Sequence, residues 1–263
     1  MLVSIESVPL AGILAGVRIE ISVESIAGVR VAARAGADRV ELCAGLSDGG
    51  LTPSVALIER AVVWGIPVHV LVRPRPGDFH YAAEEVSVMV GDIAAARAAG
   101  AEGVVVGALD SSGALDPACA AFVEAAEGLE VTLHRAIDVS ASSQRALDDA
   151  IGFGFTRVLT SGRQRSVLDG APLIKELVRQ GFGAIEVMAC GGVRAANAVR
   201  VIEATSVADL HAAVRVPVPG ATGGAVSFAG VGVPQGFDRF ETDPDEAAAL
   251  CAVIRDRNQL PSK

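Results

Sequence analysis

The sequence predicts an α/β protein built as a single (β/α)8 barrel, and three observations support this fold class. Eight apolar strand-like segments alternate with eight helical patterns across short connections. A repeated unit places a glycine before a strand and polar or glycine residues after it, as at Gly36, Gly100 and Gly154. The chain has 263 residues, 51% of them hydrophobic, which matches the roughly 250 residues of one barrel.

An open doubly wound sheet is the alternative to this barrel. A dinucleotide-binding sheet of that kind carries an early G-x-G-x-x-G motif, and the sequence has none. We therefore expect a closed barrel and no nucleotide cofactor.

The order of the elements follows from local start and stop signals. Ser25 is suited to cap the first helix and Gly36 to end it, while Thr52 and Pro53 suit the start of the second. Later helices are expected from about residues 82, 116, 143, 172, 193 and 243. The expected strands are residues 18–23, 38–43, 67–72, 102–106, 130–134, 156–160, 184–188 and 207–211.

Two segments stand outside this rhythm. Residues 1–17 are expected to form an N-terminal appendage before a barrel domain of residues 18–263. Residues 212–242 are a long Gly- and Pro-rich connection. Because loops beyond about 12–15 residues are uncommon, we expect this one to cover the barrel mouth or to contact a partner chain.

Composition excludes several classes of function. The net charge of −9 disfavours nucleic acid and anionic membranes as partners. No apolar run approaches the roughly 20 residues of a membrane span, and no Lys or Arg precedes the apolar residues of the N-terminus, as a signal peptide would require. The cysteines are widely separated, which favours reduced core thiols and a cytoplasmic protein: Cys43, Cys119, Cys190 and Cys251.

Ionisable residues gather where predicted strands end, which in a barrel is the active-site mouth. Glu41, Arg73 and His134 lie at strand ends and Asp138 follows soon after. Strand alternation allows the first three to face the barrel interior, where Arg73 would keep Glu41 ionised and His134 would titrate near neutral pH. We predict that these four residues line one pocket, although an ion-pair network that merely fills the barrel is the alternative.

Glycine-rich turns follow the sixth and seventh predicted strands. They contain Ser161 and Gly162, then Gly191 and Gly192. Backbone N–H groups in such turns bind anions, so these residues are a candidate phosphate or carboxylate site. Two glycines can equally form a tight turn with no ligand.

Four motifs together resemble the CutC family across residues 19–211. They are residues 36–54 (GADRVELCAGLSDGGLTPS), 72–79 (VRPRPGDF), 132–138 (TLHRAID) and 157–162 (RVLTSG). The resemblance implies a (β/α)8 barrel, a cytoplasmic location, homodimers or higher homo-oligomers, and a role in copper homeostasis.

The resemblance also implies Cu(I) ligands, of which this chain keeps one. The family's first-strand cysteine is replaced by Ser22, and its E-L-C cysteine is kept as Cys43. Because Cu(I) prefers paired thiolates, we predict weak copper binding with Cys43 as the ligand. Three functions remain open: a copper-binding protein, a barrel enzyme acting on a small anionic metabolite with Glu41 and His134 as acid and base, and a binding protein without turnover.

Overall fold

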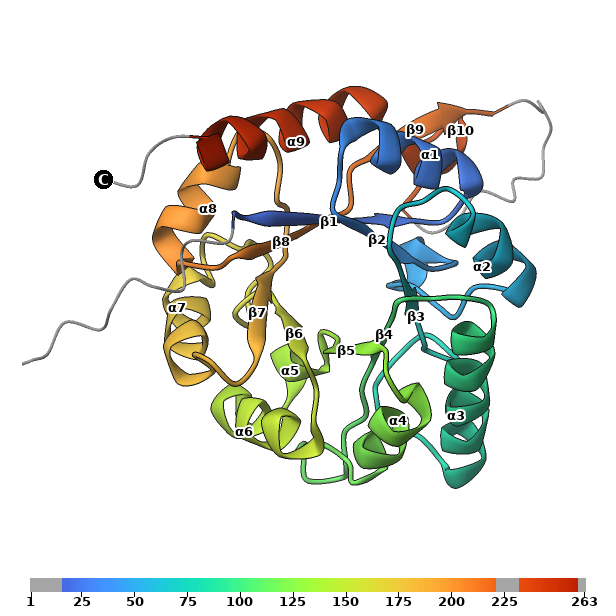
Figure 1. Ribbon diagram of the computed structural model, residues 1–263, viewed down its shortest axis with the longest axis vertical. Coiled ribbons are helices and arrows are strands. Elements are labelled where there is room, and N and C mark those ends of the chain that lie inside the picture. Colours follow the sequence, from blue (N-terminus) through green and yellow to red (C-terminus); the bar gives the residue numbers. More distant parts are fainter. Residues whose placement is uncertain (1–15, 221–231, 260–263) are drawn as a thin grey trace, which may run out of the picture.

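Eight parallel strands form one closed barrel in the computed structural model, which describes residues 16–220 and 232–259 (Figure 1). Neighbouring strands pair in sequence order, and β8 closes the ring against β1. The (β/α)8 fold class predicted from the sequence is confirmed. The strands are β1 (Arg18–Val23), β2 (Arg39–Leu42), β3 (Val68–Leu71), β4 (Gly103–Val106), β5 (Glu130–Leu133), β6 (Arg157–Thr160), β7 (Glu186–Ala189) and β8 (Asp209–Ala212).

Helices surround the barrel (Figure 1). The first begins and ends as the sequence predicts: the Ser25 hydroxyl accepts a hydrogen bond from the Gly28 amide, and Gly36 closes the helix at φ 84°. A four-residue helix, α5, follows β5 and was not predicted, because so short a segment shows no periodicity. The helices are α1 (Ile26–Ala35), α2 (Val55–Val62), α3 (Ala83–Ala98), α4 (Ala118–Ala126), α5 (Ala136–Val139), α6 (Ser143–Phe153), α7 (Ala171–Gln180), α8 (Ala198–Thr205) and α9 (Pro244–Gln259), with a 3-10 turn, η2 (Leu46–Asp48).

The outward-facing strand residues pack against these helices. Val40, Leu42 and Val70 are fully buried and belong to one large hydrophobic cluster with helix residues such as Val29 and Ile58. Burial on this scale contributes about 25 cal/mol per Å² of apolar surface, which makes it the main stabilising term.

The inward-facing residues stack in layers. Because barrel strands tilt, each layer takes its four side chains from alternate strands. The strand registers can be followed around the ring, and the inward-facing position advances by two residues at every second strand. On this path each layer returns to the residue at which it began. From floor to mouth the layers are Arg39, Gly103, Arg157 and Asp209; Glu20, His69, Thr132 and Met188; Glu41, Val105, Leu159 and His211; and Ser22, Leu71, His134 and Cys190.

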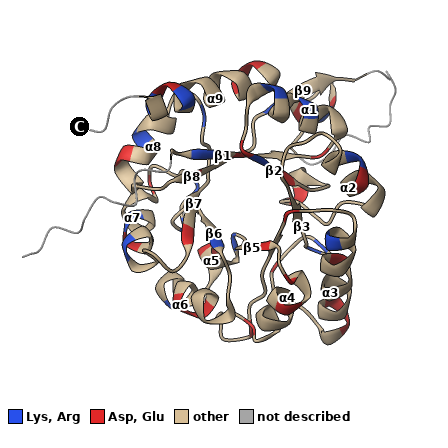
Figure 2. Ribbon diagram, viewed as in Figure 1, with Lys and Arg blue, Asp and Glu red and all other residues tan. Residues whose placement is uncertain are grey.

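The floor of the barrel is ionic. Arg39 donates to Glu20 at 2.8 Å and to Asp209 at 2.7 Å, and Arg157 pairs with Glu130 at 2.8 Å and Glu186 at 2.7 Å. Figure 2 shows residues of both charges on β1 and its neighbours. Buried charges are tolerated when they are paired in this way, and the pairs join β2 to β1 and β8, and β6 to β5 and β7.

Part of the segment predicted as a loop, residues 212–242, forms a second, two-stranded antiparallel sheet. It consists of β9 (Arg215–Pro219) and β10 (Phe237–Thr242), which lie beside α1 (Figure 1). Ser25 at the start of α1 donates to Glu241 of β10 at 3.1 Å. Two prolines in β9 conceal the strand in the sequence, because proline is tolerated only at sheet edges.

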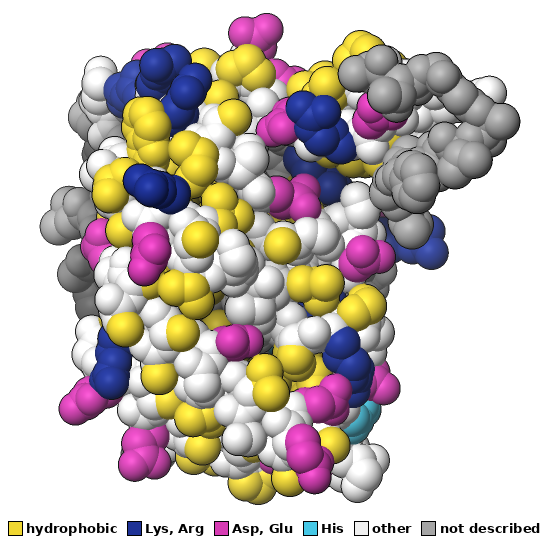
Figure 3. All heavy atoms as spheres, turned by 90° about the vertical axis from the view of Figure 1, so that its right-hand side faces the viewer, with side chains coloured by type: hydrophobic (Ala, Val, Ile, Leu, Met, Phe, Trp, Pro, Cys, Tyr) yellow, Lys and Arg dark blue, Asp and Glu magenta, His cyan; other side chains and the backbone are white. Residues whose placement is uncertain are grey.

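On the face of Figure 3, several basic side chains gather at the upper left, and below them basic, acidic and hydrophobic side chains are interspersed. None of the described helices carries an apolar stretch long enough to cross a membrane. Most of the predicted appendage, residues 1–15, lies outside the described residues.

Candidate functional site

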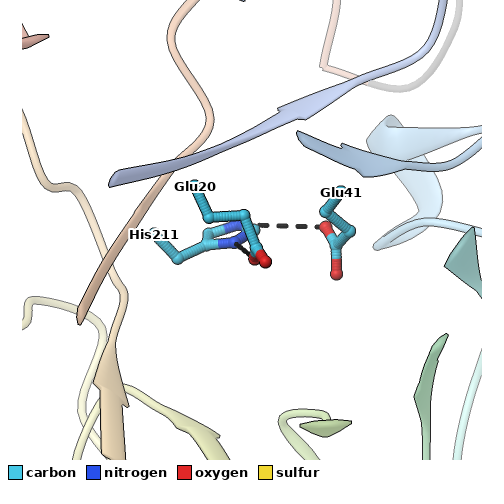
Figure 4. A group of neighbouring side chains, drawn as sticks. All are labelled: Glu20, Glu41 and His211. Carbon is cyan, nitrogen blue, oxygen red and sulfur yellow. Dashed lines mark hydrogen bonds and ion pairs between the residues drawn. The ribbon is translucent and has the colours of Figure 1, made fainter. Parts of the chain in front are cut away.

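Three ionisable side chains meet near the barrel mouth: Glu20 of β1, Glu41 of β2 and His211 of β8 (Figure 4). His211 lies between the two carboxylates, with Nδ1 2.7 Å from Glu20 Oε1 and Nε2 3.9 Å from Glu41 Oε2. The strand alternation Arg18-Ile-Glu-Ile-Ser places Glu20 inward, as it does Glu41 two residues after Arg39. Closure of the ring then sets β8 beside β1 and brings His211 to Glu20.

The surroundings shift the pKa values of these three groups in different directions. Burial by itself would raise the pKa of Glu20, but the hydrogen bond from His211 and the charge of Arg39 hold it well below its usual value. Burial raises the pKa of Glu41 to about 7; His211 opposes the rise and the Glu20 carboxylate adds to it. Burial lowers the pKa of His211, yet the two carboxylates outweigh it and raise the pKa overall. Of the three groups, Glu41 is therefore the one whose pKa lies close to neutral pH.

The same three residues are the one group within residues 16–220 and 232–259 whose His, Cys, Asp or Glu atoms could jointly hold a metal ion, all lying within 4.8 Å of one another. Two carboxylates and an imidazole are hard or borderline ligands, which suit divalent ions such as Zn²⁺, Mn²⁺ and Cu²⁺. No cysteine belongs to the group.

Arg73 does not pair with Glu41, contrary to the expectation from sequence. Its guanidinium donates to three backbone carbonyls, at 3.0 Å to Asp48, 2.9 Å to Gly50 and 2.8 Å to Gly77. The basic side chain that faces Glu41 is His211 instead. Arg73 thus ties together the loops that follow β2 and β3.

His134 is buried in the mouth layer, and it does not titrate near neutral pH as the sequence predicted. Burial and the nearby charge of Arg73 lower its pKa to about 3. Its ring packs against Phe79 with centroids 4.6 Å apart, and its Nδ1 accepts a hydrogen bond from the Ala136 amide at 3.3 Å. The imidazole is therefore neutral, with its proton on Nε2.

The Asp138 side chain, which belongs to α5, binds the end of β6 and the loop that follows it. Its carboxylate accepts from the hydroxyl of Thr160 at 2.6 Å and from the amides of Ser161 and Arg163 at 3.1 Å. The Gly162 amide donates to Thr160 Oγ1 at 2.9 Å. The amides of the first half of the predicted anion site thus already bind groups of the chain itself.

The second half of that predicted site differs. Gly191 and Gly192 adopt φ values of 110° and 81°, which favour glycine. Among the hydrogen bonds of the described residues, none uses the amide of either glycine. These two amides, one of them in a solvent-exposed residue, remain donors that an anion could use.

Cys43 is fully buried and directs its thiol toward the Val23 carbonyl at 3.6 Å. Burial and the neighbouring carboxylate of Glu41 raise its pKa well above the ordinary value. A thiol binds metal as thiolate, so this environment opposes metal binding at Cys43. All four cysteines are free and buried.

Of the residues in the central group, the site prediction included Glu41 but left out Glu20 and His211. His211 had one usable signal, its place at the end of the predicted strand 207–211. Glu20 also had a usable signal, because a carboxylate between Ile19 and Ile21 of a predicted strand must face the opposite side from these two apolar residues.

Comparisons with known proteins agree with the fold. The family model of the CutC family matches residues 17–216. A CutC protein of Pasteurella multocida is 45% identical over 196 residues, covering 74% of this chain and 80% of the relative. One from Xanthomonas campestris pv. campestris strain B100 is 48% identical over 204 residues, covering 76% and 84%.

Comparison with solved structures gives one further relative in this family and others that share only the fold. A CutC protein of Streptococcus agalactiae, whose name refers to copper homeostasis, superposes with a TM-score of 0.71 and 33% identity, covering 74% of this chain and 97% of that one. Thiamine phosphate pyrophosphorylase of Pyrococcus furiosus reaches a TM-score of 0.56 at 14% identity, covering 92% and 98%, and shares the fold alone. On the family match and the identities of these relatives, the chain belongs to the CutC family.

Proposed function

We propose that this protein binds a divalent transition-metal ion at the barrel mouth through Glu41 and His211, with Glu20 supporting the histidine. The observation that carries the proposal is the 3.9 Å separation of Glu41 Oε2 from His211 Nε2. That distance is too long for a hydrogen bond. It lies within the roughly 4.2 Å that two ligand atoms can span when each is about 2.1 Å from one ion.

The hydrogen bond of His211 to Glu20 supports this assignment. Metal-binding histidines almost always donate the second ring N–H to a carboxylate or carbonyl, which fixes the tautomer and ring orientation. His211 Nδ1 meets Glu20 Oε1 at 2.7 Å, and Arg39 holds the other oxygen of that carboxylate at 2.8 Å. His211 Nε2 is thereby directed at Glu41 (Figure 4).

The ligand atoms of this group determine which oxidation state of copper it suits. A relative in the family is named for copper homeostasis, and carboxylate with imidazole suits Cu²⁺, whereas Cu⁺ prefers sulfur. The sulfur ligand predicted from the sequence, Cys43, is a buried thiol with a raised pKa. We therefore assign any copper chemistry of this mouth to Cu²⁺ at the carboxylate–histidine group.

The test is calorimetric titration of the metal-free protein with Zn²⁺ and Cu²⁺ at pH 7.5. Glu41→Gln and His211→Gln should each weaken metal binding by about a hundredfold or more. Mutation of a residue that only supports a metal ligand already lowers the metal affinity by about 10–100-fold, and these two residues are the proposed ligands. Cys43→Ser should leave the affinity unchanged.

The chain offers a matched control. His80 Nδ1 also lies 3.9 Å from a carboxylate oxygen, that of Asp78, but both side chains are largely exposed. His80→Gln should not change the affinity. Equal losses in the His80 and His211 variants would show surface binding and refute the site. Loss confined to Cys43→Ser would return the assignment to Cu⁺ and a thiolate.

A second function, catalysis on a small anionic metabolite, is favoured by the pKa of Glu41, since a carboxyl group that titrates near 7 suits general base catalysis. In this function His134 would act as a neutral hydrogen-bond donor, because its pKa of about 3 makes it a poor acid or base at neutral pH. Turnover of candidate metabolites that Glu41→Gln abolishes is the test. A cytoplasmic location and a homo-oligomeric assembly remain predictions from the sequence.

A further inference from the structure

His134 carries a buried hydrogen-bond donor without a partner. Its side chain is 4% exposed, and Nε2 has no partner among the described residues. Because Nδ1 already accepts from the Ala136 amide, Nε2 must hold the proton of the neutral ring. Because a buried donor without a partner is unfavourable, this atom is suited to an acceptor that the described residues do not supply.

The position of this donor relates it to the proposed ion site. Strand registers place His134 in the mouth layer, directly above the layer that contains Glu41 and His211. Ser22 belongs to the same mouth layer on the far side of the barrel, is 1% exposed, and its hydroxyl also lacks a partner among the described residues.

We propose that the mouth layer binds a small organic carboxylate, with one carboxylate oxygen accepting a hydrogen bond from His134 Nε2 above the Glu41–His211 pair. This inference builds on the proposed function, because His134 lies one layer above the Glu41–His211 pair that would hold the ion. Its donor, however, belongs to the chain and can be tested without metal.

The chemistry of the surroundings selects this class of ligand. His134 Nε2 can only donate, and the Ser22 hydroxyl is able to donate, so the ligand must present acceptors. Arg73 lies near enough to depress the pKa of His134, and its guanidinium lies 5.3 Å from the Phe79 ring that packs on His134. This positive charge and a divalent ion below both favour an anion.

Ser22 has an alternative partner that His134 lacks. It borders a pocket of about 10 Å³ beneath β9 and β10, which has room for a single water molecule. A water there would satisfy the hydroxyl. The experiment therefore concentrates on His134.

The experiment titrates metal-free protein with acetate and follows the imidazole ¹⁵N resonances by long-range heteronuclear NMR. The His134 resonances are identified as those that vanish in His134→Phe. Acetate should shift the Nε2 resonance of His134. His134→Phe should weaken acetate binding by about ten- to a hundredfold, the usual effect of losing one hydrogen bond to a charged group, while His134→Gln, which keeps an N–H donor, should restore most of it.

Three results would overturn the inference: no shift of the His134 resonance, equal acetate affinity in His134→Phe, or a response to inorganic phosphate but not to acetate. Circular dichroism of each variant confirms that it folds. Zn²⁺ titration of the same variants separates the two proposals, since His134→Phe should keep Zn²⁺ affinity while His211→Gln should lose it. Acetate binding without Zn²⁺ binding would refute the ion site alone.

Discussion

Replacing Glu41 by glutamine should stabilise the metal-free protein above neutral pH. Glu41 is 5% exposed, and its pKa rises from the ordinary value of 4.5 to about 7 on folding. The folded state therefore holds the proton more tightly than the unfolded state. Stability is lost as the pH rises from about 4.5 to about 7 and then levels off.

The magnitude follows from the same two values. Each tenfold change in acidity corresponds to about 1.4 kcal/mol, so ionised Glu41 costs the folded state up to about 3 kcal/mol above pH 7. Glutamine resembles the neutral acid in size and carries no charge. The Glu41→Gln protein should thus gain up to about 3 kcal/mol at pH 8 and little or nothing at pH 4.5.

Urea unfolding of both proteins at pH 4.5, 6 and 8, in the presence of EDTA, measures this difference. Glu59→Gln on the exposed face of α2 is the control, and it should change stability by less than about 0.5 kcal/mol at every pH. A Glu41→Gln protein that is less stable than the wild type at pH 8, or a difference that does not vary with pH, would refute the reasoning.

Three further predictions concern the neighbouring residues. Arg73→Lys should lower the free energy of unfolding by about 2–4 kcal/mol, because an ammonium cannot reproduce the fork that reaches three carbonyls. Asp138→Asn should cost about 2–3 kcal/mol, because the carboxylate accepts from two backbone amides and a hydroxyl. His134 should cost the wild type about 2 kcal/mol of stability as the pH falls from 6.5 to 5, because its pKa is about 3 in the folded state and 6.5 in the unfolded state. The His134→Phe variant should not show this loss. Urea unfolding measures all three.

Exposed positions supply the controls for these variants. Arg60→Lys and Asp256→Asn should each change stability by less than about 0.5 kcal/mol. Arg73→Lys or Asp138→Asn proteins as stable as their controls would show that the loop contacts contribute little. A wild type and a His134→Phe variant with parallel pH profiles would contradict the burial of a neutral imidazole.

The sequence by itself determined the barrel and most of its elements. Glycine at the end of a helix and serine at its start act within a few residues, and alternation along a strand fixes which side chains face inward. Gly36, Ser25 and Glu41 were therefore predictable from local chemistry. The two strands after β8 were concealed because their pairing joins segments far apart and their prolines resemble a loop.

The tertiary structure alone decided which inward residues meet. His211 and Glu20 are 191 residues apart in the chain, and only closure of the ring brings β8 beside β1. Strand tilt places Glu41 in the same layer as His211, whereas Arg73 lies closer to the rim and binds loop carbonyls. Acidity also depends on this arrangement, because burial and neighbouring charge raise the pKa of Glu41 and lower that of His134. Local sequence carries neither the register nor the tilt, so it indicated the ionisable residues of the mouth but not their partners.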